Sequence, residues 1–281
     1  MARKIGLFVL ALALVGVLCG AAPAGDTLAE VKKKGVLVAG VKDSLPPFGS
    51  FDPNTKKFVG YDIDFIKYIA NKLGVKVEFK PVSSVNRIPM LMESRIDILA
   101  ATMTKTPERA KQIDFSYTYF LTGQKFLTKK GTVKTLKDLE GKKIGTAKGS
   151  TSEQNVKKAV PSATILSFDD YPQGALAVQQ GKVIAVTTDE SILAGQLGKF
   201  EKNPATKGQF EIPELSISEE PYGIGMRKGD TNFVKFVNDT ILEMEKNGEA
   251  AKIFEKWFGP NSDSPIQRGS FKITADKRGT E

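Results

Sequence analysis

The sequence predicts an α/β protein made of two doubly wound α/β lobes that are joined by a two-strand hinge. Short apolar runs that indicate buried strands alternate with amphipathic helical patterns, which is the order of a parallel sheet covered by helices. This alternation occurs twice, on either side of a mostly extended segment at residues 117–128. Two further helical patterns follow a second extended segment near residues 218–222. We therefore expect the chain to leave the first lobe, build the second and return to the first.

The first lobe is expected to open with a short helix and then to alternate strands and helices. In chain order, the predicted elements are helix 26–34, strand 36–41, helix 62–73, strand 75–82, helix 85–94 and strand 96–101. The helix at 62–73 is the clearest, because its apolar residues fall on one face and Gly74 ends it. Ser83 and Ser84 are candidate caps of the helix at 85–94.

The second lobe repeats the alternation. Its predicted elements are strand 143–147, a helix that Thr151 or Ser152 caps and that ends near residue 159, strand 164–168, helix 172–180, strand 183–187, helix 191–199 and an extended segment at 210–217. The returning chain is expected to form strand 222–226 and helices 231–246 and 249–258.

The predicted division places residues 25–122 and 221–281 in lobe 1 and residues 123–220 in lobe 2. The hinges are expected near residues 122–127 and 218–222. The tail after Gly259 is polar and weakly patterned, so we expect it to be loosely ordered.

The composition excludes several classes of function. Of 281 residues, 26% are charged and 41% are hydrophobic, as in ordinary globular proteins with room for two cores. The formal charge is +9, but the basic residues are scattered and no dense run interleaves with aromatics, so we expect no nucleic-acid binding. The chain has no histidine, and its one cysteine is Cys19, which excludes His-dependent catalysis and favours neither disulfides nor zinc. We expect no metal and no cofactor.

Residues 1–24 have the features of a signal peptide. Two basic residues precede an apolar run at 5–18 that is too short for a stable membrane span, and small residues precede a cleavage site after Ala24. A lipoprotein would instead use Cys19 as the acylated residue, but Leu18 before it is bulkier than that signal favours. No later apolar stretch approaches twenty residues, so we expect an exported, soluble product.

A candidate anion site follows the strand at 96–101. Thr102 and Thr104 come directly after the strand, and Thr106 is placed to cap a helix whose first turn contains Arg109. Free backbone N–H groups and a guanidinium would meet here, and both favour a carboxylate. On this local pattern alone, an ordinary loop with a solvated arginine is an equally good interpretation.

Two further cations fall at the carboxyl ends of predicted strands, or at a helix start beside them. These are Lys42 and Arg87. Doubly wound sheets bind ligands at this edge, so Lys42, Arg87 and Arg109 are predicted to converge. In the second lobe, the polar loop 149–152 opens a helix and offers another anion-binding N-terminus.

The chain resembles the periplasmic solute-binding proteins of polar amino-acid ABC transporters. The resemblance covers nearly the whole mature chain, and its most specific stretches are F-V-G-Y-D-I-D-F-I-K-Y-I at 58–69, T-K-T-P-E-R-A-K-Q-I-D-F-S at 104–116, L-K-D-L-E-G-K-K-I at 136–144, and residues 222–228. It implies the type II periplasmic binding protein fold, a periplasmic location, a monomer, and delivery of an amino acid to the permease subunits of a transporter.

The resemblance also implies roles for individual residues. Arg109 would clamp the ligand α-carboxylate with help from Thr102 and Thr104, and the matching second-lobe loop contains Thr151 and Ser152. Asp189 would take the α-ammonium, with Glu190 as the second choice and helix capping as the ordinary alternative for Asp189.

Two segments are similar to the aspartate/glutamate-binding branch, namely V-A-G-V-K-D-S-L-P-P-F at 38–48 and S-S-V-N-R-I-P-M-L at 83–91. In that branch the positions of Lys42 and Arg87 hold the second carboxylate of the ligand, and Ser84 lies in the same segment. Tyr171 matches a position that can offer a hydroxyl contact. A surface lysine is an equally good interpretation of Lys42.

The leading functional prediction is capture of L-glutamate or L-aspartate between the lobes, without catalysis. The alternative is a secreted dehydratase on the same fold that acts on a prephenate-like dicarboxylate, for which Asp43 and Asp189 are the candidate proton-transfer groups. A receptor ligand-sensing domain is disfavoured because no later membrane span or signalling segment follows.

Overall fold

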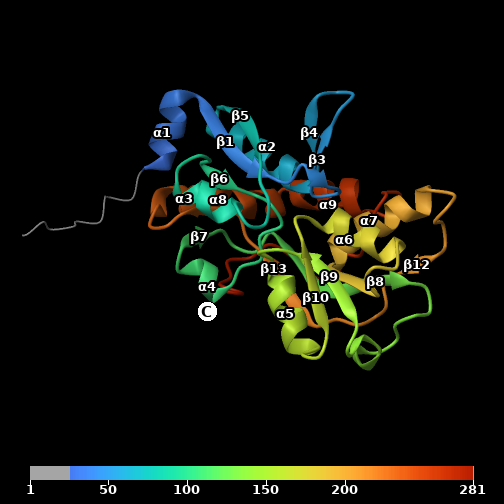
Figure 1. Ribbon diagram of the computed structural model, residues 1–281. Coiled ribbons are helices and arrows are strands. Elements are labelled where there is room, and N and C mark those ends of the chain that lie inside the picture. The colour runs from blue at the N-terminus through green and yellow to red at the C-terminus, as the bar shows by residue number, and fades with distance from the viewer. Residues whose placement is uncertain (1–25, 281) are drawn as a thin grey trace, which may run out of the picture.

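A computed structural model describes residues 26–280 and shows two α/β lobes, each built around its own sheet (Figure 1). The predicted signal peptide lies outside the described residues. The first sheet has the strand order β5-β1-β6-β14-β7. Its strands are β1 (Val36–Val41), β5 (Lys76–Pro81), β6 (Ile98–Leu99), β7 (Ile113–Phe115) and β14 (Gly225–Arg227).

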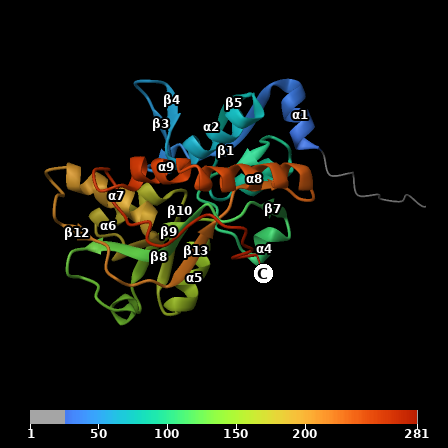
Figure 2. The same cartoon turned by 180° about the vertical axis from the view of Figure 1, so that it is seen from behind.

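Strand β1 pairs in parallel with both β5 and β6, so this half of the sheet has the predicted doubly wound arrangement. Strand β14 closes the sheet by antiparallel pairing with β6 and β7. Five helices of six or more residues accompany the sheet in the described chain: α1 (Thr27–Lys34), α2 (Tyr61–Leu73), α3 (Arg87–Met92), α8 (Thr231–Lys246) and α9 (Glu249–Phe258). Helices α2, α8 and α9 pack on one another and bury the largest apolar cluster (Figures 1 and 2).

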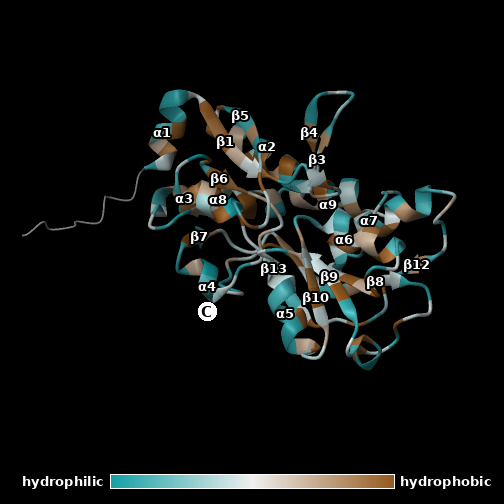
Figure 3. Ribbon diagram, in the orientation of Figure 1, coloured by the Kyte–Doolittle hydropathy of each residue, from teal (hydrophilic) through white to brown (hydrophobic). Residues whose placement is uncertain are grey.

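The second sheet has the order β10-β9-β11-β8-β12, and β13 also pairs with β8. Its strands are β8 (Phe120–Lys129), β9 (Lys143–Ala147), β10 (Thr164–Phe168), β11 (Ala185–Asp189), β12 (Phe210–Glu211) and β13 (Ser218–Tyr222). Helices α5 (Thr151–Ala159), α6 (Tyr171–Gln179) and α7 (Glu190–Lys202) cover it. Figure 3 shows the resulting pattern, with strand β1 largely hydrophobic and helix α5 largely hydrophilic.

Three smaller features complete the fold. A third sheet has the order β2-β3-β4 and consists of β2 (Ser44–Leu45), β3 (Gly49–Asp52) and β4 (Lys57–Val59). A short helix α4 (Pro107–Ala110) follows β6, and a 3-10 helix at Leu136–Leu139 precedes β9. Across residues 26–280, no helix is both long and apolar enough to span a bilayer.

The chain passes between the lobes along two paired strands. It enters lobe 2 along β8 and returns along β13, and the two run antiparallel from the pair Phe120–Tyr222 to the pair Gln124–Ser218. The predicted hinge at residues 218–222 coincides with β13, and the one at residues 122–127 lies in β8 and extends three residues beyond this ladder. The predicted strand at 222–226 is split, because β13 ends at Tyr222 and β14 starts at Gly225.

Two predicted helix caps are wrong. Helix α3 begins at Arg87 and not at residue 85, because Ser83 and Asn86 bond each other's backbone N–H groups, at 2.8 and 3.2 Å, and close a turn before the helix. Helix α5 is capped by Ser150, whose hydroxyl accepts from the N–H of Glu153 at 3.3 Å. Thr151 and Ser152 lie inside the first turn, so their hydroxyls are free to point elsewhere.

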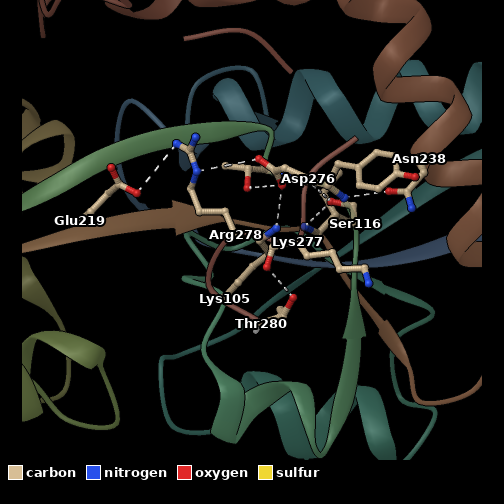
Figure 4. A network of polar contacts seen from close by, with 11 residues as sticks. Lys105, Ser116, Glu219, Asn238, Asp276, Lys277, Arg278 and Thr280 are labelled. Atoms are coloured by element: carbon tan, nitrogen blue, oxygen red, sulfur yellow. Dashed lines mark hydrogen bonds and ion pairs between the residues drawn. The ribbon is translucent and has the colours of Figure 1, made fainter. Parts of the chain in front are cut away.

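The tail after α9 is packed, contrary to the expectation of a loose segment. It forms no helix or strand, yet Ile273 is 3% exposed and belongs to the main core cluster. Asp276 accepts from the backbone N–H and the hydroxyl of Thr118, at 3.2 and 2.9 Å, and pairs with Lys105 at 3.2 Å (Figure 4). Arg278 lies 3.8 Å from Glu219 of the hinge. These partners are distant in sequence, so local pattern gives no sign of them.

Candidate functional site

Arg87 opens helix α3 with a buried guanidinium, 3% exposed as a residue. Its Nη1 donates to the carbonyl oxygens of Ala101 and Thr102, at 2.6 and 3.0 Å. Its Nε is buried and has no hydrogen-bond partner within residues 26–280. Burial, with the nearby charge of Arg109, lowers the pKa of Arg87 to about 9. One side of the guanidinium is thus pinned to lobe 1, and another N–H remains to be satisfied.

Arg109 lies in helix α4, whose predicted cap Thr106 accepts from the N–H of Arg109 at 3.2 Å. Its Nη1 donates to the carbonyl of Thr104 at 2.8 Å, within lobe 1. Its Nη2 donates to the carbonyl of Gly149 at 3.3 Å, across the cleft in lobe 2. The fork of Arg109 therefore lies between the lobes, where a ligand carboxylate would meet it.

Asp189 ends strand β11 on the opposite side of the cleft and is 4% exposed. The hydroxyl of Tyr222 donates to its Oδ2, whereas its Oδ1 is buried with no partner in the described chain. It occupies the N-cap position of α7 but makes no side-chain capping bond, so helix capping does not account for it. Glu190 instead reaches away to Lys125, at 2.9 Å, and its side chain is 38% exposed.

The electrostatics of Asp189 are those of a group that lacks a counter-ion. Burial, and then the negative charge of Glu220, raise the pKa of Asp189 to about 8. The hydrogen bond from Tyr222 and the charges of Arg87 and Arg109 oppose this shift. A cation at Oδ1 would stabilise the carboxylate, because an ion taken out of water needs a partner.

The predicted hydroxyl groups meet where the lobes touch. The hydroxyls of Thr104 and Thr151 are 3.5 Å apart across the cleft, and Thr151 also donates to Glu220 at 3.0 Å. Ser152 is 1% exposed, and its Oγ lies 3.3 Å from the hydroxyl of Thr188 and 3.4 Å from that of Tyr171. Thr102 does not join them: its hydroxyl donates to the carbonyl of Ala101 at 2.8 Å, and its backbone is left-handed, with φ of 48°.

Lys42, at the end of β1, is 7% exposed and is not a surface lysine. Its Nζ donates to the hydroxyl of Ser84 at 3.1 Å. Burial, with the charge of Arg87, holds the pKa of Lys42 well below its usual value. A cavity of about 290 Å³ between the lobes is lined by Lys42, Ser84 and Tyr171. Three acidic residues also line it: Asp43, Asp169 and Asp170.

The structure adds residues that the sequence did not single out for the site. Tyr222 bonds Asp189, Glu220 bonds Thr151, and Asp62 bonds the backbone of Thr102 at 3.1 Å. Asp62 and Tyr222 lie within family-like stretches, which is the signal that could have drawn attention to them. Glu220 carries no such signal. Residues 26–280 contain no group of three or more His, Cys, Asp or Glu side chains placed to hold a metal ion.

Two buried cations, Lys42 and Arg87, and the half-buried Arg109 on one lobe face a half-partnered carboxylate on the other, in a cleft beside a two-strand hinge. Fold and site together are those of a two-lobed binder of small solutes. The chain belongs to the bacterial extracellular solute-binding proteins, family 3, whose model matches residues 37–260. This confirms the recognition made from the sequence motifs.

Named relatives differ in ligand. The chain is 38% identical over 237 residues to the ABC transporter glutamine-binding protein GlnH of Bacillus subtilis strain 168, covering 83% of this chain and 84% of the relative. It is 36% identical over 251 residues to the glutamate/aspartate import solute-binding protein of Salmonella typhimurium strain LT2, covering 85% and 82%. A solved structure of an ancestral arginine-binding protein bound to glutamine matches with a TM-score of 0.73 at 44% identity, covering 80% of this chain and 98% of that one. The predicted two-lobed fold is confirmed.

Proposed function

We propose that this protein is the solute-binding component of an amino-acid ABC transporter and that it captures L-glutamate or L-aspartate between its lobes. It acts in the periplasm as a monomer and delivers its ligand to the permease subunits. The observation that carries the proposal is that one buried cleft holds two charged groups with unpartnered atoms, Oδ1 of Asp189 and Nε of Arg87. A ligand that offers both a cation and an anion satisfies both groups.

The α-amino-acid group is assigned to the part of the cleft between Arg109 and Asp189. The fork of Arg109 suits a carboxylate, which can accept two parallel N–H bonds. The α-ammonium then lies against Asp189, whose free Oδ1 faces no other cation at hydrogen-bond distance in the described chain. Thr104 and Thr151 approach from the two lobes and supply hydroxyls at the same place. Contacts from both lobes exist only in the closed form, so the ligand favours closure.

The second carboxylate is assigned to Arg87 and Lys42. Within residues 26–280, neither cation has an acidic oxygen within 4.0 Å, and Asp43 and Asp170, which line the same cavity, act on Lys42 only from a greater distance. Buried cations without a counter-ion cost several kcal/mol each. A distal carboxylate offsets that cost, whereas the neutral amide of glutamine brings no charge. This argument favours an acidic ligand even though two of the similar proteins are named for glutamine.

Isothermal titration of ligand-stripped, refolded protein tests the proposal. L-glutamate, L-aspartate, L-glutamine and L-arginine are titrated into wild type and into Arg87→Ala. Arg95→Ala is the matched control, because Arg95 is solvent-exposed, with a 62% exposed side chain. We expect affinity near micromolar for the acidic pair, which is about −8 kcal/mol, lost in Arg87→Ala and kept in Arg95→Ala. Tighter binding of glutamine or arginine would overturn the acidic specificity.

A secreted dehydratase is the second candidate, and one observation favours it. A carboxyl group whose pKa is about 8, as for Asp189, can hold a proton at neutral pH and act as a general acid. Incubation of the protein with a prephenate-like dicarboxylate, followed by NMR, separates the two functions. An unchanged substrate is expected from a binding protein, and turnover that disappears in Asp189→Asn would favour the enzyme.

A further inference from the structure

Asp62 is a fully buried carboxylate that none of the site assignments above uses. It lies in the first turn of α2 and is 0% exposed. The N-cap of this helix is Gly60, which has no side chain that could cap it. Within the described chain Asp62 forms no ion pair. The charges of Lys42 and Arg87 act on it, but Lys42 donates its hydrogen bond to Ser84 and Arg87 donates to the carbonyl of Ala101. A buried carboxylate without a cation is costly, so its hydrogen bonds need an explanation.

Both oxygens of Asp62 are engaged, and both bonds lead to the ligand cleft or the hinge. Oδ2 accepts from the backbone N–H of Thr102 at 3.1 Å. Oδ1 accepts from the hydroxyl of Tyr119 at 2.6 Å. Tyr119 immediately precedes β8, and its own N–H donates to the carbonyl of Tyr222 at the end of β13, at 3.0 Å. Asp62 therefore ties the loop after β6 to the base of the two crossing strands.

The conformation of Thr102 makes the first bond important. Its φ is 48°, a left-handed value that is unfavourable for a β-branched residue and persists only when the surroundings impose it. The hydrogen bond to Asp62 fixes the direction of the Thr102 N–H. The carbonyl of Ala101 belongs to the same peptide unit as this N–H, so its direction is fixed with it.

The result of this backbone turn is seen at Arg87. The carbonyls of Ala101 and Thr102 are consecutive, and both accept from the same Nη1 atom. Consecutive carbonyls of an extended strand point to opposite sides, so the left-handed residue is what allows them to converge. The guanidinium of Arg87 thereby receives two anchors at Nη1, while its Nε is left without a partner in the described chain.

We propose that Asp62 is a positioning residue for ligand binding, which acts through the Thr102 peptide to orient the guanidinium of Arg87. The proposal rests on the proposed function, in which Arg87 takes the distal group of the ligand. Asp62 itself does not touch the ligand. Its effect on affinity should therefore pass through Arg87.

A double-mutant cycle tests this coupling. Asp62→Ala is measured in the wild-type background and in Arg87→Lys, which keeps the cation but not the two-carbonyl anchor. In wild type we expect Asp62→Ala to weaken ligand binding by roughly 10–100-fold, by analogy with the residues that orient metal ligands, whose loss has an effect of this size. On Arg87→Lys we expect a further loss of no more than about threefold, because the anchor is already gone. Equal losses in the two backgrounds would overturn the proposal.

Asp64→Ala is the matched control. Asp64 is also an acidic residue in the first turn of α2, but its carboxylate bonds Lys256 and Trp257 of α9, at 2.6 and 2.8 Å. It should lower thermal stability and leave affinity within about threefold of wild type, since its partners are remote from Arg87. A loss of affinity as large as that of Asp62→Ala would show that any damage to this helix has the same effect, and would contradict the proposal.

Asp62→Asn distinguishes positioning from a general structural role. Its amide oxygen can accept from Thr102, and its amide nitrogen can donate to the hydroxyl of Tyr119, so affinity should recover to within about threefold of wild type. If Asp62→Ala does not fold, Asp62→Ser replaces it, because the serine hydroxyl is too short to reach Thr102. Failure of Asp62→Asn to recover binding would count against the proposal.

The cycle is run with whichever of the four amino acids wild type binds most tightly. If wild type does not bind acidic amino acids, the proposed specificity is wrong. The cycle, run with another amino acid, still measures the coupling between Asp62 and Arg87. Tight binding of glutamate with no coupling in the cycle would defeat this inference alone.

Discussion

At the scale of single residues, the site is defined by polar atoms that the protein buries but does not satisfy. Asp189 shows this best, because Tyr222 satisfies one of its oxygens and leaves the other without a partner. Arg87 is its counterpart among the cations, since two carbonyls hold Nη1 while Nε has none. Such groups are uncommon in folded proteins. The described chain has three others, on Ser191, Gln196 and Arg268, but Asp189 and Arg87 are the two of opposite charge in one cleft, as the proposed ligand requires.

The raised pKa of Asp189 predicts that ligand binding releases a proton. In the closed, ligand-free cleft the pKa is about 8, so much of the carboxyl is protonated at pH 7. The ligand ammonium binds the ionised form and lowers the pKa, so the proton leaves on binding and affinity rises from pH 6 toward pH 8. Titrations at pH 7 in buffers of different ionisation enthalpy measure the released proton.

Burial also raises the pKa of Asp62, to about 7, so Asp62 could release a proton in the same pH range. Measuring proton release in Asp62→Asn separates the contribution of Asp62 from that of Asp189. Proton uptake on binding, or affinity that does not change with pH, would contradict the assignment of the ammonium to Asp189.

Lys42 provides a second prediction at this scale. Lys42→Met keeps most of the side-chain volume but removes a buried cation, so affinity for L-glutamate should fall by about tenfold or more, whereas affinity for L-glutamine should change much less. Lys76→Met is the control, because Lys76 lies exposed on the neighbouring strand β5. Equal losses for both amino acids would indicate that Lys42 supports the fold of the cleft and not the charge of the ligand.

At the scale of elements, the sequence was a good guide wherever the signal was local. The strands at 36–41, 143–147 and 164–168 and the helices at 231–246 and 249–258 agree with the structure to the residue, because periodicity and caps define them. The start of α3 was misplaced because Ser83 and Asn86 satisfy each other before the helix begins. In that case two plausible caps competed, and the pattern alone could not choose between them.

The contacts that sequence reasoning missed all join elements far apart in the chain. Asp62 meets Thr102 and Tyr119, and Asp189 meets Tyr222. Periodicity reports which face of an element is buried, but it does not report which buried polar atoms meet. Charged residues at strand ends could be named from the sequence, whereas the neutral and acidic partners that orient them could not.

The packed tail gives a prediction about stability. Ile273 is 3% exposed and joins the main core cluster, so Ile273→Ala should lower the free energy of unfolding by about 2–4 kcal/mol. The neighbouring Thr274 is exposed, and Thr274→Ala should change it by less than about 0.5 kcal/mol. Chemical denaturation of both variants makes the comparison. Equal, small effects would mean that the tail is loosely ordered, as its composition suggested.

At the scale of the whole molecule, binding and lobe closure are one process, because the site residues come from both lobes. Closure brings the backbones of the two lobes into close contact at two glycines of lobe 2, where any side chain would obstruct the approach. A Cβ on Gly149 would lie 3.2 Å from the carbonyl oxygen of Ser84, and a Cβ on Gly195 would lie 2.2 Å from that of Pro46. Gly195 is in α7 of lobe 2 and Pro46 is in lobe 1, so this contact belongs to the closed form.

Gly195→Ala should therefore weaken ligand binding by about tenfold or more without destabilising the ligand-free protein. Alanine is preferred over glycine inside a helix by about 1 kcal/mol, so the ligand-free variant should be as stable as wild type or more so. The nearest atoms to its added methyl group all belong to Pro46 and Pro47 of lobe 1. Titration calorimetry measures the affinity, and small-angle X-ray scattering at saturating ligand measures whether the radius of gyration still falls.

Gly174→Ala, in helix α6 of the same lobe, is the matched control. Its added Cβ would lie 2.6 Å from Cγ2 of Val186 in strand β11, so the obstruction stays within lobe 2. This variant should lose stability and keep its affinity. If Gly195→Ala binds and compacts like wild type, the contact between α7 and Pro46 is not required for closure. If Gly174→Ala loses affinity equally, damage within lobe 2 and not the contact between the lobes accounts for the loss.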